Sequence, residues 1–397
     1  MNPRWLLPEQ MEDLLPAEAW QLEAARSRLL ALFRGHGYEL VVPPALEYME
    51  SLLTGSGEHA DLVTFKVVDQ LSGRLLGLRA DITPQVARID AHRLAGEGVR
   101  RLCYAGSTYR ARSGDAGASR EPFQIGAELY GHAGLAADLE VQGLLIAALA
   151  VLDVHDYVLD LGHVGIFAAL VEGLPAALED ALLDAMQGKN TPRVEELTVD
   201  LPEARRSALR ARPSLCGGSE MIALARQRLP ALPGITAALA QLEAAAASLA
   251  GQSRLEIDLA ELRGYAYHSG MVFAVYAPGY PGSVARGGRY DAIGEAFGRS
   301  RPATGFSIDL RDLLPRLTMP AAPGVAWLPA SAAAAFGAGE LAAQLARHRA
   351  AGLVVIRELE GGDGRIDPRC DRHLVASGGA LREQPIESNS IQGSTRP

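Results

Sequence analysis

The stretch from Arg263 to Asp291 constrains the fold of this chain most strongly, because glycines interrupt its two short runs of strand-forming residues. The first run, Arg-Gly-Tyr-Ala-Tyr-His-Ser-Gly-Met-Val-Phe, begins at Arg263, and the second ends in Gly-Gly-Arg-Tyr-Asp. Glycine lets a backbone turn sharply and approach a ligand closely. The guanidinium of Arg263 suits a carboxylate, and Tyr267, His268 and Tyr290 can form hydrogen bonds around a small ring. A surface hairpin that carries arginine and tyrosine at its rim explains the same residues equally well.

A helix followed by a strand is predicted near the start of the chain. Residues 17–34 have apolar side chains at helical spacing, and the glycines at 35 and 37 predict the end of this helix. Residues 38–42 form a strand pattern that stops at Pro43-Pro44, since proline cannot lie inside a central ladder. Two further strand patterns, 64–69 and 74–79, predict a hairpin.

Polar side chains occur at two places where a small ligand could be bound. Asp81 and Thr83 precede a helix pattern, and capping of that helix accounts for Thr83 but not for Asp81. Strands are predicted at 104–110 and 123–129, and alternation places Gln124 and Glu128 on one face. An amide and a carboxylate so placed can surround a ligand ammonium, although a solvent-facing strand has the same alternation.

These motifs together resemble histidyl-tRNA synthetase and its paralogues, which have the class II synthetase fold. Arg-Gly-x-x-Tyr and Gly-Gly-Arg-Tyr-Asp resemble the histidine-binding signature, and the helix and strand that end at Pro44 resemble motif 1. The hairpin 104–129 resembles motif 2, with Arg110 at the α-phosphate arginine, and residues 303–313 resemble motif 3. The resemblance implies an α+β fold, in which helices flank an antiparallel sheet, and a homodimer formed through motif 1.

The resemblance also implies a histidine site without a catalytic residue. Asp81, Thr83 and Gln124 are expected to hold the ammonium, and Glu128, Tyr267 and His268 to contact the imidazole. Arg263, with Tyr290 and with Arg110 as a further candidate, is expected to hold the carboxylate. His268 replaces the second tyrosine of the family's Tyr-Tyr pair.

The nucleotide motifs depart from those of an active synthetase. In register from Gly305, the motif 3 arginine that stacks on adenine is replaced by Asp312, and the motif glycine by Asp309. A carboxylate cannot form that cation–π contact, and it repels a triphosphate. A shift of one residue would instead place Arg311 there. Motif 2 carries Arg112 where the family has an acid.

The chain divides into three parts by pattern. Residues 1–320 are predicted to form the synthetase-like domain, with a helical insertion at about 167–251; residues 321–377 a small α/β region; and residues 378–397 a disordered polar tail. A synthetase normally carries a larger anticodon-binding domain after its catalytic domain. Four arginines in the insertion, at 205, 206, 210 and 212, are typical of a solvated helix face, so we predict no nucleic-acid partner.

Composition excludes several other classes of protein. A net charge of −9 argues against a surface that binds nucleic acid generally. The three cysteines are widely spaced and odd in number, which favours a reducing cytoplasm over a disulfide framework. The first residues lack the long apolar run of a signal peptide, and the sequence shows no membrane-length apolar run and no histidine spacing typical of zinc. We therefore predict no metal, no cofactor and no membrane contact.

The pattern as a whole favours the regulatory member of the family, the synthetase-like subunit of ATP phosphoribosyltransferase. That resemblance implies a partner, the short-form catalytic subunit, in a hetero-octamer that is required for the first step of histidine biosynthesis and is inhibited by histidine. An active histidyl-tRNA synthetase, or another histidyl-adenylate-forming paralogue, is the alternative, and both need ATP. A purely structural scaffold without a ligand would show no heat on titration with histidine.

Overall fold

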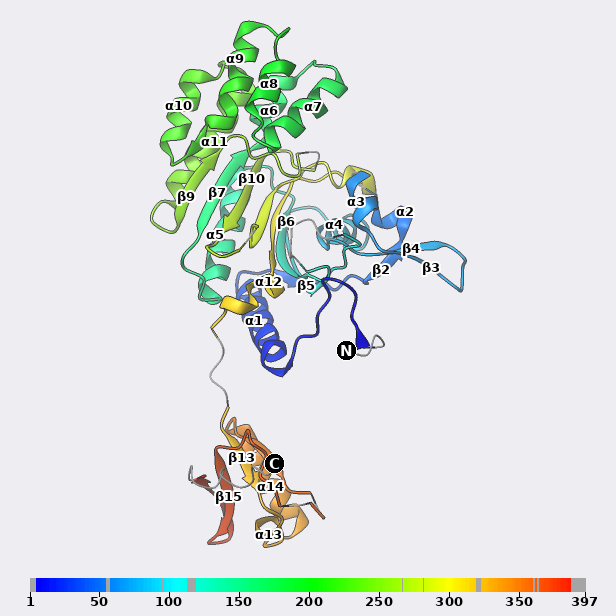
Figure 1. The fold of residues 1–397 in the computed structure, drawn as a ribbon, viewed down its shortest axis with the longest axis vertical. Coiled ribbons are helices and arrows are strands. Elements are labelled where there is room, and N and C mark those ends of the chain that lie inside the picture. Colours follow the sequence, from blue (N-terminus) through cyan, green and yellow to red (C-terminus); the bar gives the residue numbers. More distant parts are fainter. Residues whose placement is uncertain are drawn as a thin grey trace, which may run out of the picture. The chain divides into compact units, whose positions relative to one another are not determined.

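The computed structural model describes residues 5–54, 58–94, 96–112, 119–265, 267–280, 282–318, 323–359, 361–362 and 364–386. It divides into two compact units, Met1–Thr318 and Met319–Pro397 (Figure 1). Each unit has its own hydrophobic core among the described residues.

A nine-stranded sheet forms the centre of the first unit, in the order β1-β5-β6-β12-β11-β10-β7-β9-β8. Every neighbouring pair is antiparallel except β1–β5 and β7–β9. The strands are β1 (Glu39–Leu40), β5 (Arg100–Ser107), β6 (Phe123–Tyr130), β7 (Val158–His163), β8 (Cys216–Gly217), β9 (Arg254–Asp258), β10 (Met271–Tyr276), β11 (Ala285–Arg289) and β12 (Ala303–Asp309). Chain connections therefore bring β6 and β12, which are far apart in sequence, into the middle of the sheet.

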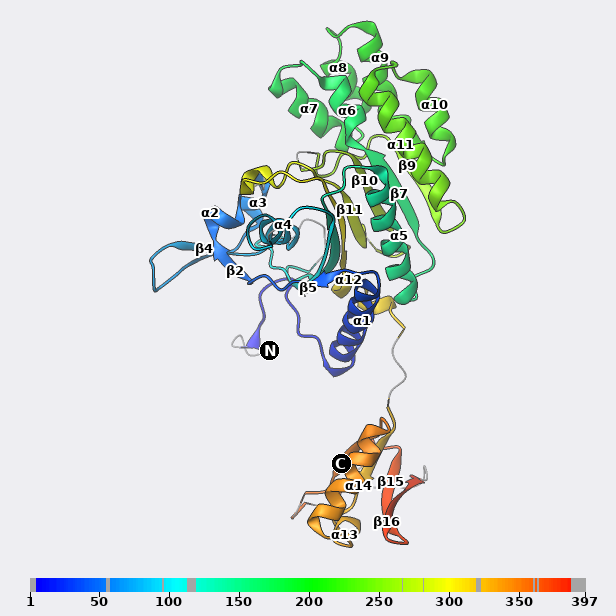
Figure 2. The ribbon, with the colours of Figure 1, turned by 180° about the vertical axis from the view of Figure 1, so that it is seen from behind.

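Helices cover both faces of the sheet at its β5–β6 end. Side chains alternate between the two faces along each strand, so β5 contributes buried side chains to both. Helices α1 (Pro16–Gly35) and α5 (Leu135–Val151) pack on one face, where Cys103 joins Leu29 and Phe33 of α1 in the main core. Helix α4 (Thr83–His92) packs on the other face, against Leu102 and Tyr104 (Figure 2). The predicted end of α1 is confirmed, and Gly37 has the left-handed φ of +82° that favours glycine.

The predicted hairpin at 64–79 is confirmed as β3 (Lys66–Val68) and β4 (Leu75–Leu78), which pair antiparallel. A third strand, β2 (Leu46–Tyr48), completes this small sheet beside α2 (Met49–Leu52) and α3 (Glu58–Val63). The strand predicted at 38–42 pairs only at Glu39–Leu40.

The segment between β7 and β9 is helical apart from the short strand β8. Its helices are α6 (Val164–Val171), α7 (Ala176–Gln187), α8 (Thr191–Leu197), α9 (Glu203–Ala211), α10 (Glu220–Arg228) and α11 (Pro233–Leu249). Helix α11 packs on α5 and α6, which ties this segment to the main core. After β12 the chain continues into α12 (Leu310–Leu313), as the motif 3 pattern predicts.

The second unit is a four-stranded sheet with two helices. Its strands are β13 (Val325–Leu328), β14 (Val354–Arg357), β15 (Arg372–Ser377) and β16 (Ala380–Pro385), in the order β14-β13-β15-β16, and its helices are α13 (Ala330–Ala333) and α14 (Ala338–Ala350). The prediction of disorder from residue 378 is wrong for β16. Gly378 and Gly379 both have positive φ and form the turn that pairs β16 with β15, and residues 387–397 lie outside the described residues.

Candidate functional site

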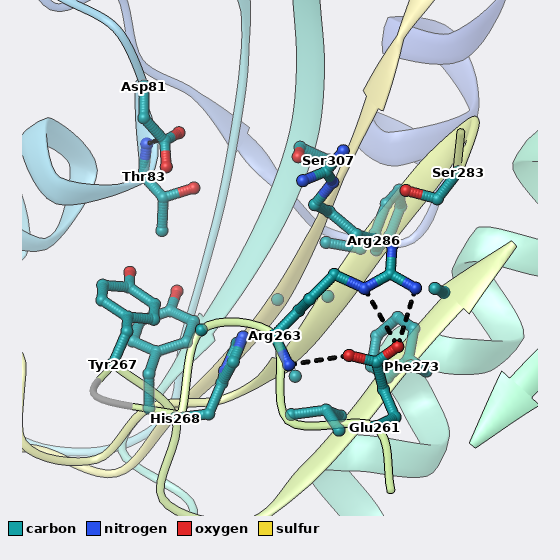
Figure 3. Close-up of a pocket in the computed structure, with 18 of the residues that line it drawn as sticks. Asp81, Thr83, Glu261, Arg263, Tyr267, His268, Phe273, Ser283, Arg286 and Ser307 are labelled. Atoms are coloured by element: carbon teal, nitrogen blue, oxygen red, sulfur yellow. Dashed lines mark hydrogen bonds and ion pairs between the residues drawn. The ribbon is translucent and has the colours of Figure 1, made fainter. Parts of the chain in front are cut away.

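A cavity of about 410 Å³ opens over the face of the sheet formed by β6, β12, β11 and β10. Seven of the nine predicted ligand-binding residues line it, and Figure 3 shows several of them arranged around the cavity. They are Asp81, Thr83, Glu128, Arg263, Tyr267, His268 and Tyr290. The other two, Arg110 and Gln124, line a neighbouring cavity of about 350 Å³, which shares Asp81 with the first.

Glycines on neighbouring strands make room for the cavity floor. Strand pairing places Glu128 opposite Gly305, Gly305 opposite Gly288, and Gly288 opposite Val272, in one row across the sheet. A Cβ at Gly305 would overlap a carboxylate oxygen of Glu128, and a Cβ at Gly288 would lie 2.9 Å from the His268 ring. Both positions therefore require glycine if these two side chains are to lie where they do.

The Glu128 carboxyl group, only 1% exposed, lies at the bottom of the cavity and is held by three hydroxyl groups. Thr83 Oγ1 donates to Glu128 Oε1 at 2.9 Å, the Tyr104 hydroxyl donates to the same oxygen at 3.2 Å, and the Tyr290 hydroxyl donates to Oε2. Burial raises the pKa of Glu128 from 4.5 to about 8, even though these hydrogen bonds act in the opposite direction. The group can therefore carry a proton or a charge near neutral pH.

The interpretation of Thr83 as a helix cap is wrong. Helix α4 begins at Thr83, and its cap residue is Ile82, whose side chain makes no capping hydrogen bond. The Thr83 hydroxyl instead bonds with Tyr104 at 3.0 Å as well as with Glu128. Its place at the first helical position directs the hydroxyl into the binding site.

Aromatic rings form the side wall. The Tyr267 and Tyr290 rings have centroids 5.0 Å apart, and the His268 ring lies edge-on to Tyr267 at 5.3 Å. Burial lowers the pKa of His268 to about 4, so its imidazole is neutral at pH 7, and Nδ1 lies 3.2 Å from the Arg289 carbonyl oxygen, which can only accept. The Tyr267 hydroxyl is buried without a hydrogen-bond partner in the described part of the chain, so it is available to a ligand.

Gln124 acts on the site through Asp81. Its amide nitrogen donates to Asp81 Oδ1 at 2.8 Å, and its amide oxygen accepts from the Ile82 backbone N–H at 2.9 Å. The Thr83 backbone N–H also donates to Asp81 Oδ1, at 3.1 Å. These three bonds fix the turn that carries Asp81 at the junction of the two cavities.

The Arg263 guanidinium is already paired within the protein. It lies 2.9 Å from Glu261 Oε2 through one terminal nitrogen and 3.1 Å through Nε (Figure 3). It also donates to the Tyr276 hydroxyl. Glu261 lines the same cavity and is not among the residues predicted from the sequence. The only sequence feature that could have indicated this ion pair is the position of Glu261 two residues before Arg263. Residues 263–265 and 267 lie in turns, so the prediction of a strand-like run there is wrong.

The neighbouring cavity occupies the place predicted for the nucleotide. Asp309 and Asp312 both line it, whereas Arg311 does not. Arg311 instead lies 3.7 Å from the Glu121 carboxylate and donates to the Glu121 backbone carbonyl at 3.2 Å. The geometry therefore favours the register that places Asp312, and not Arg311, at the motif 3 position. Burial and the charge of Asp312 raise the pKa of Asp309 to about 6.

The described residues show neither a metal-binding cluster nor a membrane-spanning helix. Within the residues that the structure describes, no group of three or more His, Cys, Asp or Glu side chains is placed to hold a metal ion. None of the described helices is both long enough and apolar enough to cross a membrane.

Comparison with known proteins places the chain in a family. Residues 10–313 match the model of the histidyl-tRNA synthetase family. An ATP phosphoribosyltransferase regulatory subunit from Cupriavidus necator is 53% identical over 94% of this chain and 97% of its own length. This chain belongs to the ATP phosphoribosyltransferase regulatory subunits.

Solved structures share the fold of this chain. An ATP phosphoribosyltransferase regulatory subunit/histidyl-tRNA synthetase from Bacillus halodurans matches with a TM-score of 0.79 and 28% identity, over 90% of this chain and 94% of that chain. A chain of the ATP phosphoribosyl transferase (HisG:HisZ) complex from Thermotoga maritima shares the fold, with a TM-score of 0.56 and 22% identity over 75% of this chain and 98% of that chain. The predicted class II synthetase-like α+β fold is confirmed.

Proposed function

We propose that this regulatory subunit binds free histidine in the cavity above β6, β12, β11 and β10 and does not catalyse a reaction there. We further propose that it associates with a short-form ATP phosphoribosyltransferase chain, is required for the first step of histidine biosynthesis and transmits inhibition by histidine. The observation that carries the proposal is the contrast between the two cavities. The first keeps the polar groups around Glu128, whereas the second, which Arg110, Arg286 and Arg316 also line, has Asp312 at the motif 3 position where a synthetase carries the arginine that stacks on adenine.

The polar groups of the first cavity suit the side chain and the ammonium of histidine. Glu128 can accept from an imidazole N–H, and the unpaired Tyr267 hydroxyl and the neutral His268 lie beside it. Asp81, oriented by Gln124 and close to Thr83, presents a carboxylate for the α-ammonium. The Tyr290 hydroxyl donates to Glu128. We therefore assign Tyr290 to the part of the proposed site that contacts the imidazole, and not to the part that holds the ligand carboxylate.

The carboxylate of the ligand would face the arginines of the two cavities. Arg263 lines the first cavity and Arg110 the second, on either side of Asp81. Since Arg110 does not line the cavity that holds Glu128, it contacts histidine only if the ligand extends past Asp81.

We propose that two copies of the chain associate through the motif 1 region, inside a hetero-octamer in the cytoplasm. Support comes from apolar side chains that this region leaves exposed in the single chain: Val42 is 77% exposed, and Leu40 and Leu46 are also exposed. Large apolar side chains grouped on a surface are typical of an interface. The name of the relatives, regulatory subunit, implies a catalytic chain as the partner.

Histidine can regulate the assembly only if it binds the active and the inhibited state with unequal affinity. The test is co-expression of the full chain with a short-form catalytic chain. We expect a stable complex whose phosphoribosyltransferase activity depends on both chains and falls when histidine is added. A Glu128→Gln complex should assemble and remain active, but histidine should inhibit it far less.

Two results would contradict the proposal. One is the absence of a complex between the two chains, and the other is a complex that histidine does not inhibit. A matched control is Glu140→Gln, which removes a carboxylate of α5 that pairs with Arg101 and does not line the cavity. That variant should keep the full response to histidine.

A further inference from the structure

We propose that Arg286, and not Arg263, binds the α-carboxylate of the amino acid held in this cavity. The inference rests on the proposed histidine site and adds a residue that decides its specificity. Arg286 precedes Gly287-Gly288 on β11, and it lines both the first cavity and the neighbouring one.

Availability separates the two arginines. The Arg286 side chain is exposed, and among the described residues no hydrogen bond or ion pair joins it to another group, although its backbone pairs within the sheet. Arg263, in contrast, is bound to Glu261, whose carboxylate side chain is only 10% exposed, and to Tyr276. For Arg263 to bind a ligand carboxylate, it would have to share or leave that pair, and a largely buried carboxylate without its cation is strongly unfavourable. Figure 3 shows the Arg263 side chain turned toward Glu261, while Arg286 lies near Ser307.

Strand register places Arg286 at a suitable distance from Glu128. Arg286 pairs with Ser307, and Ser307 with Gly126, in a row two residues along the strands from the row that contains Glu128, Gly305 and Gly288. Two residues along a strand correspond to about 7 Å, a separation that an amino acid the size of histidine can span from its ring to its carboxylate.

The surroundings of Arg286 complete a site for a zwitterion. Asp81 lines the same two cavities as Arg286, so the junction offers one anion and one unpaired cation. The hydroxyl side chains of Ser283 and Ser307 line both cavities as well and can donate to a carboxylate. An ammonium at Asp81 and a carboxylate at Arg286 would leave the imidazole directed toward Glu128.

The test measures, by calorimetry on the full chain, the affinity for histidine and for histidinol, which carries a hydroxymethyl group in place of the carboxylate. The wild-type chain should prefer histidine. Arg286→Ala should weaken histidine binding by about 10- to 100-fold, the usual effect of losing a charge-assisted hydrogen bond, and leave histidinol binding unchanged. Arg263→Ala should retain the preference for histidine. Arg316→Ala is the matched control, because Arg316 lines only the neighbouring cavity and lies over the Tyr280 ring.

The outcomes distinguish this inference from the proposed function. A wild-type chain that binds neither compound overturns both. A wild-type chain that binds histidine, together with an Arg286→Ala variant that still prefers histidine over histidinol, overturns the role of Arg286 alone. Loss of the preference in Arg263→Ala but not in Arg286→Ala returns the carboxylate to Arg263. If Arg286→Ala changes only the binding of ATP or pyrophosphate, Arg286 binds a phosphate instead and the inference is wrong.

Discussion

Replacement of Glu128 by glutamine should make the stability of the chain less dependent on pH. Burial raises the pKa of Glu128 from 4.5 to about 8, so between these values the folded protein holds a proton that the unfolded chain has lost. The free energy of unfolding therefore falls as the pH rises through this interval. A difference of about 3.5 between the two pKa values corresponds to about 5 kcal/mol in total, of which about 2–3 kcal/mol is lost between pH 6 and pH 9.

Glutamine has nearly the same shape as glutamate and does not titrate, so the variant lacks this loss. Urea unfolding of both proteins at pH 6, 7, 8 and 9 measures the difference directly. We expect the wild-type free energy of unfolding to fall by about 2–3 kcal/mol more than that of Glu128→Gln over this range. Glu140→Gln is the control, because the pKa of Glu140 is lowered by Arg101, and the group is ionised throughout the range in both states. Parallel pH profiles for wild type and Glu128→Gln would refute the reasoning about this buried carboxyl group.

Three further substitutions test the two cavities. Gly305→Ala should lower the free energy of unfolding by about 1–3 kcal/mol and abolish histidine binding, because the new Cβ would overlap Glu128. Its control is Gly143→Ala on α5, where a Cβ meets nothing within 4 Å, and this variant should not be destabilised. Equal effects of the two substitutions would contradict the steric argument. Tyr290→Phe removes a hydrogen bond that lowers the pKa of Glu128, so that pKa should rise further and stability at pH 8 should fall by about 1–2 kcal/mol in urea unfolding; an unchanged midpoint would argue against the bond. Asp312→Asn should lower the pKa of Asp309, which the charge of Asp312 helps to raise to about 6, and carboxyl NMR titration would show no change if the two groups do not interact.

The central sheet and much of the cavity could be predicted from local patterns. Alternation along residues 123–129 places Gln124 and Glu128 on one face, and the structure shows both side chains there, with Glu128 at the cavity floor and Gln124 bonded to Asp81. The glycine signature at 287–288 likewise lies under the cavity. Such features depend on the period of a strand or on the absence of a side chain, and both are visible in sequence.

Which charged side chains form ion pairs could not be predicted from the sequence in the same way. The contact that occupies Arg263 depends on the turn that brings Glu261 back to it, and the availability of Arg286 depends on the lack of such a contact among the residues that the structure describes. The turn at Gly378-Gly379 was a missed signal, because two successive glycines between strand-forming residues favour a hairpin, whereas the polar composition that follows suggested disorder.

The most direct test of a histidine site separated from nucleotide chemistry is histidine-dependent exchange of pyrophosphate into ATP by the purified full chain. The two aspartates in the neighbouring cavity predict no exchange above background, in a preparation that binds histidine by calorimetry. Exchange that depends on histidine would show that the chain forms an adenylate, and would contradict the account.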